Sequence, residues 1–363
     1  MSWRLSRYKA GDLVEVRSAA EILATLDAQG RCNGLPFMPE MLAFCGQRLR
    51  VRAVAHKTCE TARKTWQGRR LETTVHLADT RCNGAAHGGC QADCTLFWHD
   101  AWLKPIDSAT PQSTPSPSQT TLTEPQLHAL AKLPTSTDEK PRYTCQTTQL
   151  FDATTLLPWW DVRQYWRDVR TGNHSPRHVL GVLWLAFLEK CQAHTPLGYR
   201  LIKIFREGAH RWLTGRELPN IQGAIPRGAR TPGSTAPALQ PGDYVRVKSE
   251  AEIIQTVDEA NNNRGLSFEA EMAVYCGKIF RVRSCVTEIL DEQSGEMVKM
   301  KQPCIILDGA YCSALYSQCR LLCPRAVTPY WREIWLEKIE TPAPSSQTVD
   351  NATPQSAPAT TSA

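Results

Sequence analysis

The sequence lacks the features that mark several large classes of protein. No apolar run reaches the ~18 residues that a membrane-spanning helix needs. Met1–Asp12 has neither an apolar core nor a cleavage-like site, so we expect no secretory signal. No phosphate loop, dinucleotide fingerprint, G-x-S-x-G elbow or H-E-x-x-H motif occurs. These absences predict a cytoplasmic protein outside the commonest nucleotide-binding and hydrolase classes.

Charge and composition also lack extremes. The 363 residues carry 42 Lys+Arg against 36 Asp+Glu, a formal net charge of +6. Hydrophobic residues make up 42% of the chain, which is enough to build packed cores. At about 150 residues per domain, the length predicts two or three domains. Cysteine, by contrast, is abundant: there are 14, and because disulfides rarely persist in the cytoplasm, metal binding is the first hypothesis.

An internal repeat organises the chain. Gly11–Ser18 reappears as Gly242–Ser249, and the same offset aligns Gly34 with Gly265 and Phe37 with Phe268. Roughly half of the first copy's opening forty residues match, which excludes chance. The repeat resumes at its end, where Trp98 and Trp102 correspond to Trp331 and Trp335. These four tryptophans are predicted to fill core or interdomain grooves.

The repeat and the composition predict the domain boundaries. Linker and tail are expected where Ser, Thr, Pro and Gln dominate without apolar periodicity. The predicted segments are a first Cys-rich module at 8–106, a flexible linker at 107–140, a basic, Trp-rich helical segment at 141–216, a linker at 217–240, a second Cys-rich module at 241–340 and a disordered tail at 341–363.

Within each copy the pattern favours short strands with few helices. Leu13–Val16 is rich in β-formers, and 49–54 alternates as a half-buried strand does. Ser18 with Glu21 is a capping-box signature for a short helix. Asp291–Gly295 is typical of a hairpin turn. The fold predicted is α+β and mainly β: two small SH3-like β-barrel modules in tandem repeat, separated by a short helical segment.

Cysteine spacing predicts metal sites. Each copy has a Cys-x₃-Cys pair, preceded seven or eight residues earlier by another cysteine. Residues four apart on a helical turn face the same way, so such a pair can chelate one ion. Thiolates in a compact group suit Zn²⁺, with iron or an iron–sulfur cluster as the alternative. The candidate ligands are Cys59, Cys82, His87, Cys90 and Cys94 in the first copy, and Cys276, Cys304, Cys312, Cys319 and Cys323 in the second.

Other interpretations of these residues remain open. The cysteines can be ordinary buried thiols or oxidised pairs. If His87 binds metal and one coordination position stays open, water activation becomes possible. A weaker alternative is that Cys59 is a nucleophile whose pKa is lowered by the nearby imidazole of His56. Glu40 and Glu271 occupy matched positions and can cap a turn or bind a ligand; capping is the prediction.

The central segment carries the charge excess. Residues 141–216 contain eleven Lys+Arg and five Asp+Glu, a net of 11 − 5 = +6. Three arginines, Arg163, Arg167 and Arg170, share one helical face. We expect the helices here to pack on themselves or on the barrels and to join the modules. Peripheral membrane contact is the alternative, and the signal for nucleic-acid binding is weak.

Five runs resemble an uncharacterised family of bacterial proteins: Gly34–Met41, His56–Cys59, His87–Cys90, Cys304–Gly309 and Pro329–Leu336. The resemblance covers most of residues 8–340. It implies a bacterial protein of this repeat architecture and brings no reaction or ligand with it.

The leading functional expectation is therefore a cytoplasmic binding or scaffold protein with a protein partner, stabilised by zinc in each small module. One alternative is a metalloenzyme or redox protein with its active centre in the first module, where potential ligands are richest. The other is a peripheral membrane adaptor that uses the central helices.

Overall fold

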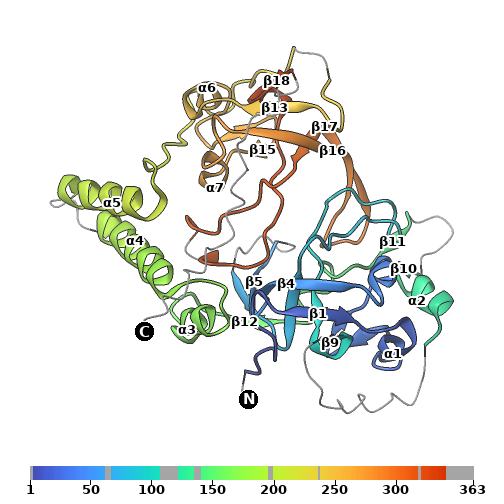
Figure 1. Cartoon of the computed structure of the whole chain (residues 1–363). Helices are drawn as coiled ribbons and strands as arrows, with labels where there is room; N and C mark the ends of the chain where they lie inside the picture. Colours follow the sequence, from blue (N-terminus) through green and yellow to red (C-terminus); the bar gives the residue numbers. More distant parts are fainter. Residues whose placement is uncertain are drawn as a thin grey trace, which may run out of the picture. The chain divides into compact units, whose positions relative to one another are not determined.

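The computed structural model describes residues 3–61, 67–106, 122–134, 140–194, 199–235, 238–317 and 320–340. These residues combine helices with several antiparallel sheets (Figure 1), which confirms the mixed class predicted from the sequence. The chain divides into two units, each built from three separate segments. Unit 1 comprises Met1–Arg167, Val286–Cys304 and Cys319–Thr328; unit 2 comprises Asp168–Cys285, Ile305–Gln318 and Pro329–Ala363.

The main sheet of unit 1 has the order β8-β7-β4-β1-β9. Its strands are β1 (Leu13–Val16), β4 (Arg48–Val54), β7 (Thr74–Leu77), β8 (Trp98–His99) and β9 (Leu103–Pro105). Strand β1 pairs with both β4 and β9, and all pairings are antiparallel. A register shift between Val51 and Ala53 breaks the β4–β7 ladder. Such irregularities bend a sheet, which helps a short one to cover a core.

The second copy builds the same strand order, β17-β16-β13-β18. Its strands are β13 (Tyr244–Val247), β16 (Ile279–Leu290), β17 (Met297–Leu307) and β18 (Leu336–Ile339). These match β7-β4-β1-β9 in position within the repeat. The predicted turn at Asp291–Gly295 joins β16 to β17, with the Gly295 N–H donating to the Asp291 carbonyl at 2.9 Å.

Strands β16 and β17 also explain why the units differ from the contiguous modules predicted. Both strands are long, and the division falls within each of them, after Cys285 and after Cys304. Unit 1 therefore includes the far half of a hairpin that belongs to the second copy in sequence. Apolar alternation finds a strand, but it does not reveal which core each half of a long strand serves.

Short helices and small ladders complete the two copies. The capping box predicted at Ser18/Glu21 is present, and the repeat-related Ser249 forms the same box with Glu252. The helices and 3₁₀ turns are α1 (Ala19–Leu23), η1 (Pro39–Phe44), η2 (Asp100–Trp102), α2 (Glu124–Leu130), α6 (Glu250–Ile254), α7 (Ala270–Ala273) and η5 (Glu333–Trp335). The small ladders are formed by β2 (Arg31–Cys32) with β3 (Leu35–Pro36), β5 (Lys57–Cys59) with β6 (Gly68–Arg70) and β12 (Thr155–Leu156), β10 (Lys132–Leu133) with β11 (Arg142–Tyr143), and β14 (Asn262–Asn263) with β15 (Leu266–Ser267).

The segments predicted as linkers differ in their secondary structure. Residues 122–134 form α2 and β10, because Thr123 and Gln126 make a capping box and Leu127 is buried in the unit 1 core. In the described part of 217–240 no helix or strand forms, as its prolines predict. Residues 107–121 and 341–363, predicted as linker and tail, lie outside the described residues.

Equivalent tryptophans anchor each core. Trp98 and Trp102 are fully buried in unit 1, and Trp331 and Trp335 are fully buried in unit 2, which confirms their prediction as core residues. The Trp102 indole N–H donates to the Thr25 hydroxyl at 3.2 Å, and the Trp335 indole makes the same bond at 2.9 Å with its own repeat-related threonine, Thr256. At Trp102 and Trp335 the ring is buried while its one donor is satisfied, which is what allows these two positions to be tryptophan.

The central helices are α3 (Arg163–Arg170), α4 (Pro176–His194) and α5 (Tyr199–Thr214). In unit 2, α4 and α5 pack against each other (Figure 1). Their outer faces stay exposed: Leu180, Trp184 and Phe187 on α4 are 67%, 53% and 55% exposed. The predicted self-packing therefore buries only part of the apolar surface. None of the described helices is long and apolar enough to cross a membrane.

Candidate metal centre

A glycine-rich loop between β7 and β8 gathers the donors. Gly84, Gly88 and Gly89 all have positive φ, the conformation that glycine adopts without strain. The carbonyl of Gly84 accepts from the N–H groups of His87 and Gly89 at 3.1 and 3.0 Å. A Cβ at Gly84 would lie 2.0 Å from the Cys90 carbonyl oxygen. Only glycine permits this fold-back, which brings Cys82, His87 and Cys90 close together.

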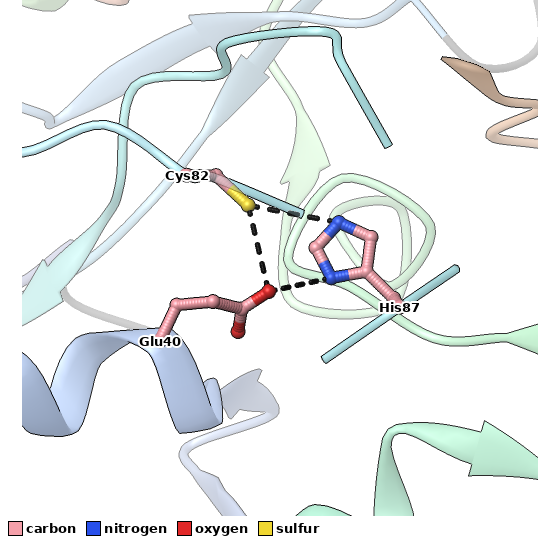
Figure 2. A group of neighbouring side chains, drawn as sticks. All are labelled: Glu40, Cys82 and His87. Atoms are coloured by element: carbon pink, nitrogen blue, oxygen red, sulfur yellow. Dashed lines mark hydrogen bonds and ion pairs between the residues drawn. The ribbon is translucent and has the colours of Figure 1, made fainter. Parts of the chain in front are cut away.

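Glu40 meets this loop from η1. Figure 2 shows Glu40, Cys82 and His87 pointing toward one another, and their donor atoms all lie within 4.8 Å. The Cys82 Sγ is 3.6 Å from His87 Nε2 and 3.8 Å from Glu40 Oε1. The other ring nitrogen, His87 Nδ1, is 2.8 Å from Glu40 Oε1. Glu40 and His87 are buried, with 8% and 2% of their surface exposed.

Cys90 is the next donor. Its sulfur hydrogen-bonds to His87 and accepts backbone N–H groups from Leu290, at 3.2 Å, and from Ala92. Burial raises the pKa of the Cys90 thiol, but these three donors outweigh burial and hold the pKa below its usual value. Backbone donors aimed at sulfur stabilise a thiolate, the form in which cysteine binds metal.

The ionisable groups of the cluster shift one another's pKa in opposite directions. Burial opposes ionisation of His87, yet the neighbouring Cys82, Cys90 and Glu40 raise its pKa well above the usual range. Burial likewise opposes ionisation of Glu40, yet adjacent His87 and the Ala86 N–H lower its pKa. Without a metal ion, these shifts favour a buried His87 imidazolium beside the Glu40 carboxylate. A divalent cation bound at the imidazole would supply positive charge in place of the released proton.

Two buried atoms show that hydrogen bonds alone do not complete the cluster. Among the described residues, Glu40 Oε2 and His87 Nδ1 have no aligned hydrogen-bond partner, although Nδ1 lies close to Oε1. Buried polar atoms in this state are costly. In a tetrahedral zinc site, with Zn–S near 2.3 Å and Zn–N near 2.0 Å, ligand atoms lie about 3.5 Å apart. The 3.6 Å separation of Cys82 Sγ and His87 Nε2 matches that spacing.

Two further cysteines line a small cavity beside the cluster. Cys94 and Cys145 share this cavity with Cys82, His87 and Cys90. Burial raises the pKa of Cys145 to about 11 and raises that of Cys94 strongly. Both are therefore neutral thiols as they stand. Sequence reasoning did not select Cys145, because it lies outside the repeat.

The remaining predicted ligands are dispersed. Cys59 lies in unit 1 beside Cys323 and Arg325, away from the Glu40 group. Cys304 is buried near the end of unit 1's hairpin segment, and Cys276 packs against the unit 2 core. Cys312 belongs to unit 2, so Cys312 and Cys323 fall in different units. Cys319 lies outside the described residues.

In the second copy the glutamate has a different role. Glu271 accepts from the Ser313 hydroxyl and from the backbone N–H groups of Leu315 and Tyr316, at 3.1 and 2.9 Å. Both of its oxygens are thereby satisfied. This is the loop cap that the sequence predicts, whereas its counterpart Glu40 has soft donors around it. The sequence feature that could have identified Glu40 as a ligand is the presence of an acidic residue within the otherwise apolar run from Met38 to Met41.

Comparison with known proteins adds no identification. No family model matches the chain, and neither the curated proteins nor the solved structures contain a match.

Proposed function

We propose that the protein is a zinc-stabilised binding or scaffold protein, with Cys82, His87, Cys90 and Glu40 as the zinc ligands. The observation that carries the proposal is the buried Glu40–Cys82–His87 group, whose donor atoms lie within 4.8 Å. Two sulfurs, one imidazole and one carboxylate form a donor set that suits Zn²⁺. The two copies are then SH3-like modules, of which the first is closed by metal.

A structural role fits the site better than a catalytic one. Three of the four side chains are buried, and the proposed ligand set would fill all four coordination positions with protein groups. Catalytic zinc keeps one position open for water or substrate. The ion would instead tie η1 to the loop at residues 82–94, elements that lie far apart in the sequence. A small module gains much of its folding free energy from such a link.

Metal analysis tests this proposal. Protein purified anaerobically is expected to carry about one equivalent of zinc, and His87→Ala and Cys90→Ser are expected to lose it. Cys45→Ser is the matched control, because Cys45 is a partly buried cysteine of the same module outside the cluster. Less than a tenth of an equivalent of any transition metal in the wild-type protein would contradict the proposal. A brown protein with charge-transfer absorption would indicate that the site binds an iron–sulfur cluster and not zinc.

The scaffold role uses the outer face of α4. Leu180, Trp184 and Phe187 are spaced four and three residues apart, so they lie on one side of the helix, and the two rings stack at 5.5 Å. An exposed apolar stripe of this kind is typical of a protein-docking surface. The partner that fits it is another apolar helix pair, and a second copy of the chain supplies one.

The paired charges of the central helices favour a protein partner over a lipid surface. Arg163 pairs with Asp161 at 2.7 Å, and Arg167 lies over the Trp3 ring at 3.6 Å, so two of the three predicted lipid-binding arginines are engaged. On α5, Arg206 pairs with Glu189 at 3.5 Å. Attraction to anionic lipid needs unpaired basic groups. The interaction expected is therefore hydrophobic and weakly dependent on salt.

Sedimentation of the purified protein tests the docking surface. We expect concentration-dependent dimers for the wild type and monomers for the double variant Leu180→Glu/Trp184→Glu. Ala193→Glu, at an exposed position of the same helix, is expected to dimerise like the wild type. A monomer that cosediments with anionic vesicles would contradict the protein-docking proposal and favour the membrane adaptor.

A further inference from the structure

A second group of cysteine chemistry in unit 1 is separate from the candidate zinc ligands. Strand β5 (Lys57–Cys59) is completely buried, and the segment Leu321–Arg325 lies against it. The side chains of Cys59 and Cys323 are hydrogen-bonded to each other. Cys59 is 3% exposed, whereas Cys323 is partly exposed. The pair therefore joins a buried cysteine to a partly exposed one.

The backbone around this thiol pair is fixed on both sides of Cys323. On one side, the Lys57 ammonium donates to the Leu321 carbonyl at 2.9 Å. On the other, the Arg325 guanidinium donates to the Cys59 carbonyl at 3.1 Å and to the Thr61 hydroxyl at 3.2 Å. These bonds hold the two sulfurs next to each other, so a covalent link between them requires little movement of the chain.

Arg325 also determines the chemistry. It is buried, with 3% of its surface exposed, and it pairs with Glu292 at 3.8 Å. The neighbouring thiols Cys59, Cys94 and Cys323 all interact with its positive charge. A guanidinium in this place repels a divalent cation and stabilises a thiolate. This charge makes a thiolate pair a better fit here than a zinc site, so the proposal below gives Cys59 a different role from the zinc ligand that the spacing predicts.

The electrostatics support a reactive thiolate. The hydrogen bond from Cys323, opposed by burial and aided by the charges of Arg325 and Arg320, lowers the pKa of Cys59 to about 6. A thiol with such a pKa is largely ionised at neutral pH. Cys145, equally buried but without these partners, has a raised pKa. Ionisation thus follows the local partners and not burial alone.

We propose that Cys59 and Cys323 form a peroxide-responsive thiol pair that closes reversibly into a disulfide between β5 and the Leu321–Arg325 segment. The reaction begins at Cys323, the partly exposed residue of the pair. Cys323 passes its proton to the hydrogen-bonded Cys59 thiolate, and the Cys323 thiolate so formed attacks one peroxide oxygen. The O–O bond breaks, a sulfenic acid forms on Cys323, and the released hydroxide takes the proton back from Cys59 to give water. The Cys59 thiolate then attacks the Cys323 sulfur, the S–O bond breaks, and a second hydroxide leaves as water after protonation. Hydrogen peroxide is reduced by two electrons, the two thiols are oxidised by two, and a dithiol reductant reverses the change.

Peptide mass spectrometry of the full-length, zinc-loaded protein tests this proposal. After a limited dose of hydrogen peroxide and blocking of free thiols, we expect a peptide pair that joins Cys59 to Cys323 with the loss of two hydrogens. Dithiothreitol should release it. Cys59→Ser and Cys59→Ala should instead leave Cys323 as a sulfenic acid that dimedone labels. Arg325→Gln should slow the link about tenfold, since it removes the cation that stabilises the thiolates.

The control and the contrary outcomes are distinct. Cys145→Ser, a buried cysteine outside the pair, should form the link at the wild-type rate. Recovery of Cys59 unlinked when most of Cys323 is oxidised would overturn the proposal, as would equal linking of Cys59 to Cys94. Zinc measured in the same samples separates this proposal from the metal site. Cys59→Ser should retain its zinc, and the link should form before zinc is released.

Discussion

Glu40 and Glu271 occupy the same position in the two copies, yet they are used differently. Glu271 accepts only hydroxyl and backbone donors and has no unsatisfied oxygen. Glu40 faces a thiol and an imidazole, and its Oε2 has no partner among the described residues. A carboxylate that its own loop satisfies is a structural cap. A carboxylate that keeps an unpartnered oxygen beside a thiol and an imidazole can instead bind a cation. The local donors, and not the fold, therefore decide the role of each glutamate.

Metal removal should give the largest difference between the copies. If zinc is held at a concentration about a thousandfold above its Kd, binding stabilises the module by about 4 kcal/mol. A chelator should therefore speed hydrogen exchange in β7 of unit 1 and leave β13 of unit 2 nearly unchanged. Cys90→Ser should reproduce the effect without chelator. Equal loss of protection in β7 and β13 would show that metal does not distinguish the copies.

Exchanging each glutamate for glutamine sharpens the same comparison. Glu40→Gln removes a ligand charge, and we expect zinc affinity to fall at least tenfold to a hundredfold, as measured by competition with a chromogenic chelator. Glu271→Gln disturbs hydrogen bonds only, so the unfolding free energy should fall by about 1–3 kcal/mol with zinc content unchanged. The distinction fails if Glu271→Gln also removes zinc.

The dependence of stability on pH should differ between zinc-free and zinc-bound protein. The folded pKa of Glu40 is lowered from 4.5, so its contribution is present above that pH and is lost as pH falls through the folded value. The folded pKa of His87 is raised from 6.5, so its contribution is full below that pH and declines as pH rises toward the folded value. Zinc-free protein should therefore protect the Ala86 amide best between pH 4.5 and 6.5.

Zinc binding should reverse the way protection of the Ala86 amide changes as pH rises above neutrality. Because His87 and the cysteines must lose protons to bind metal, zinc affinity rises with pH. The zinc-bound protein should then protect Ala86 better at pH 8 than at about pH 6, the opposite of the zinc-free protein. The Leu315 amide, which donates to Glu271 at 3.1 Å, belongs to a loop without histidine and serves as the internal control. The same trend in both zinc states would speak against binding by His87.

The sequence predicted what local and periodic signals encode. The repeat, the capping boxes, the hairpin turn at Asp291–Gly295 and the buried tryptophans all depend on short-range patterns or on alignment of the copies. His87, Cys82 and Cys90 were found because they share one loop. Glu40 was seen but assigned to capping, since spacing alone does not show which oxygen is left without a partner.

What the sequence did not predict depends on long-range placement. Cys323 was grouped with Cys312 by spacing, yet the chain passes from unit 2 to unit 1 between them, and Cys323 meets Cys59, about 260 residues earlier. Arg325, the buried cation at that pair, has no local motif. The outer face of α4 was expected to be covered, but it is exposed. The sequence pattern of an apolar run does not show whether the run is buried or exposed.

The smallest expected effect tests whether the copies are alike away from the site. In α1 and α6 the capping serine accepts from the third helical residue at 3.3 Å in both cases, and the glutamate returns a bond of 2.9 Å in both. Ser18→Ala and Ser249→Ala each remove an N-cap worth about 1 kcal/mol. Local unfolding free energies from hydrogen exchange at α1 and α6 should fall by that amount, equally within a few tenths. Because both serines are solvent-exposed and, among the described residues, their side chains hydrogen-bond only within their own capping boxes, zinc should not change either value. A zinc-dependent cost for Ser18→Ala alone would mean that the metal orders the whole first copy, and the contrast between Glu40 and Glu271 would then describe two modules and not merely two loops.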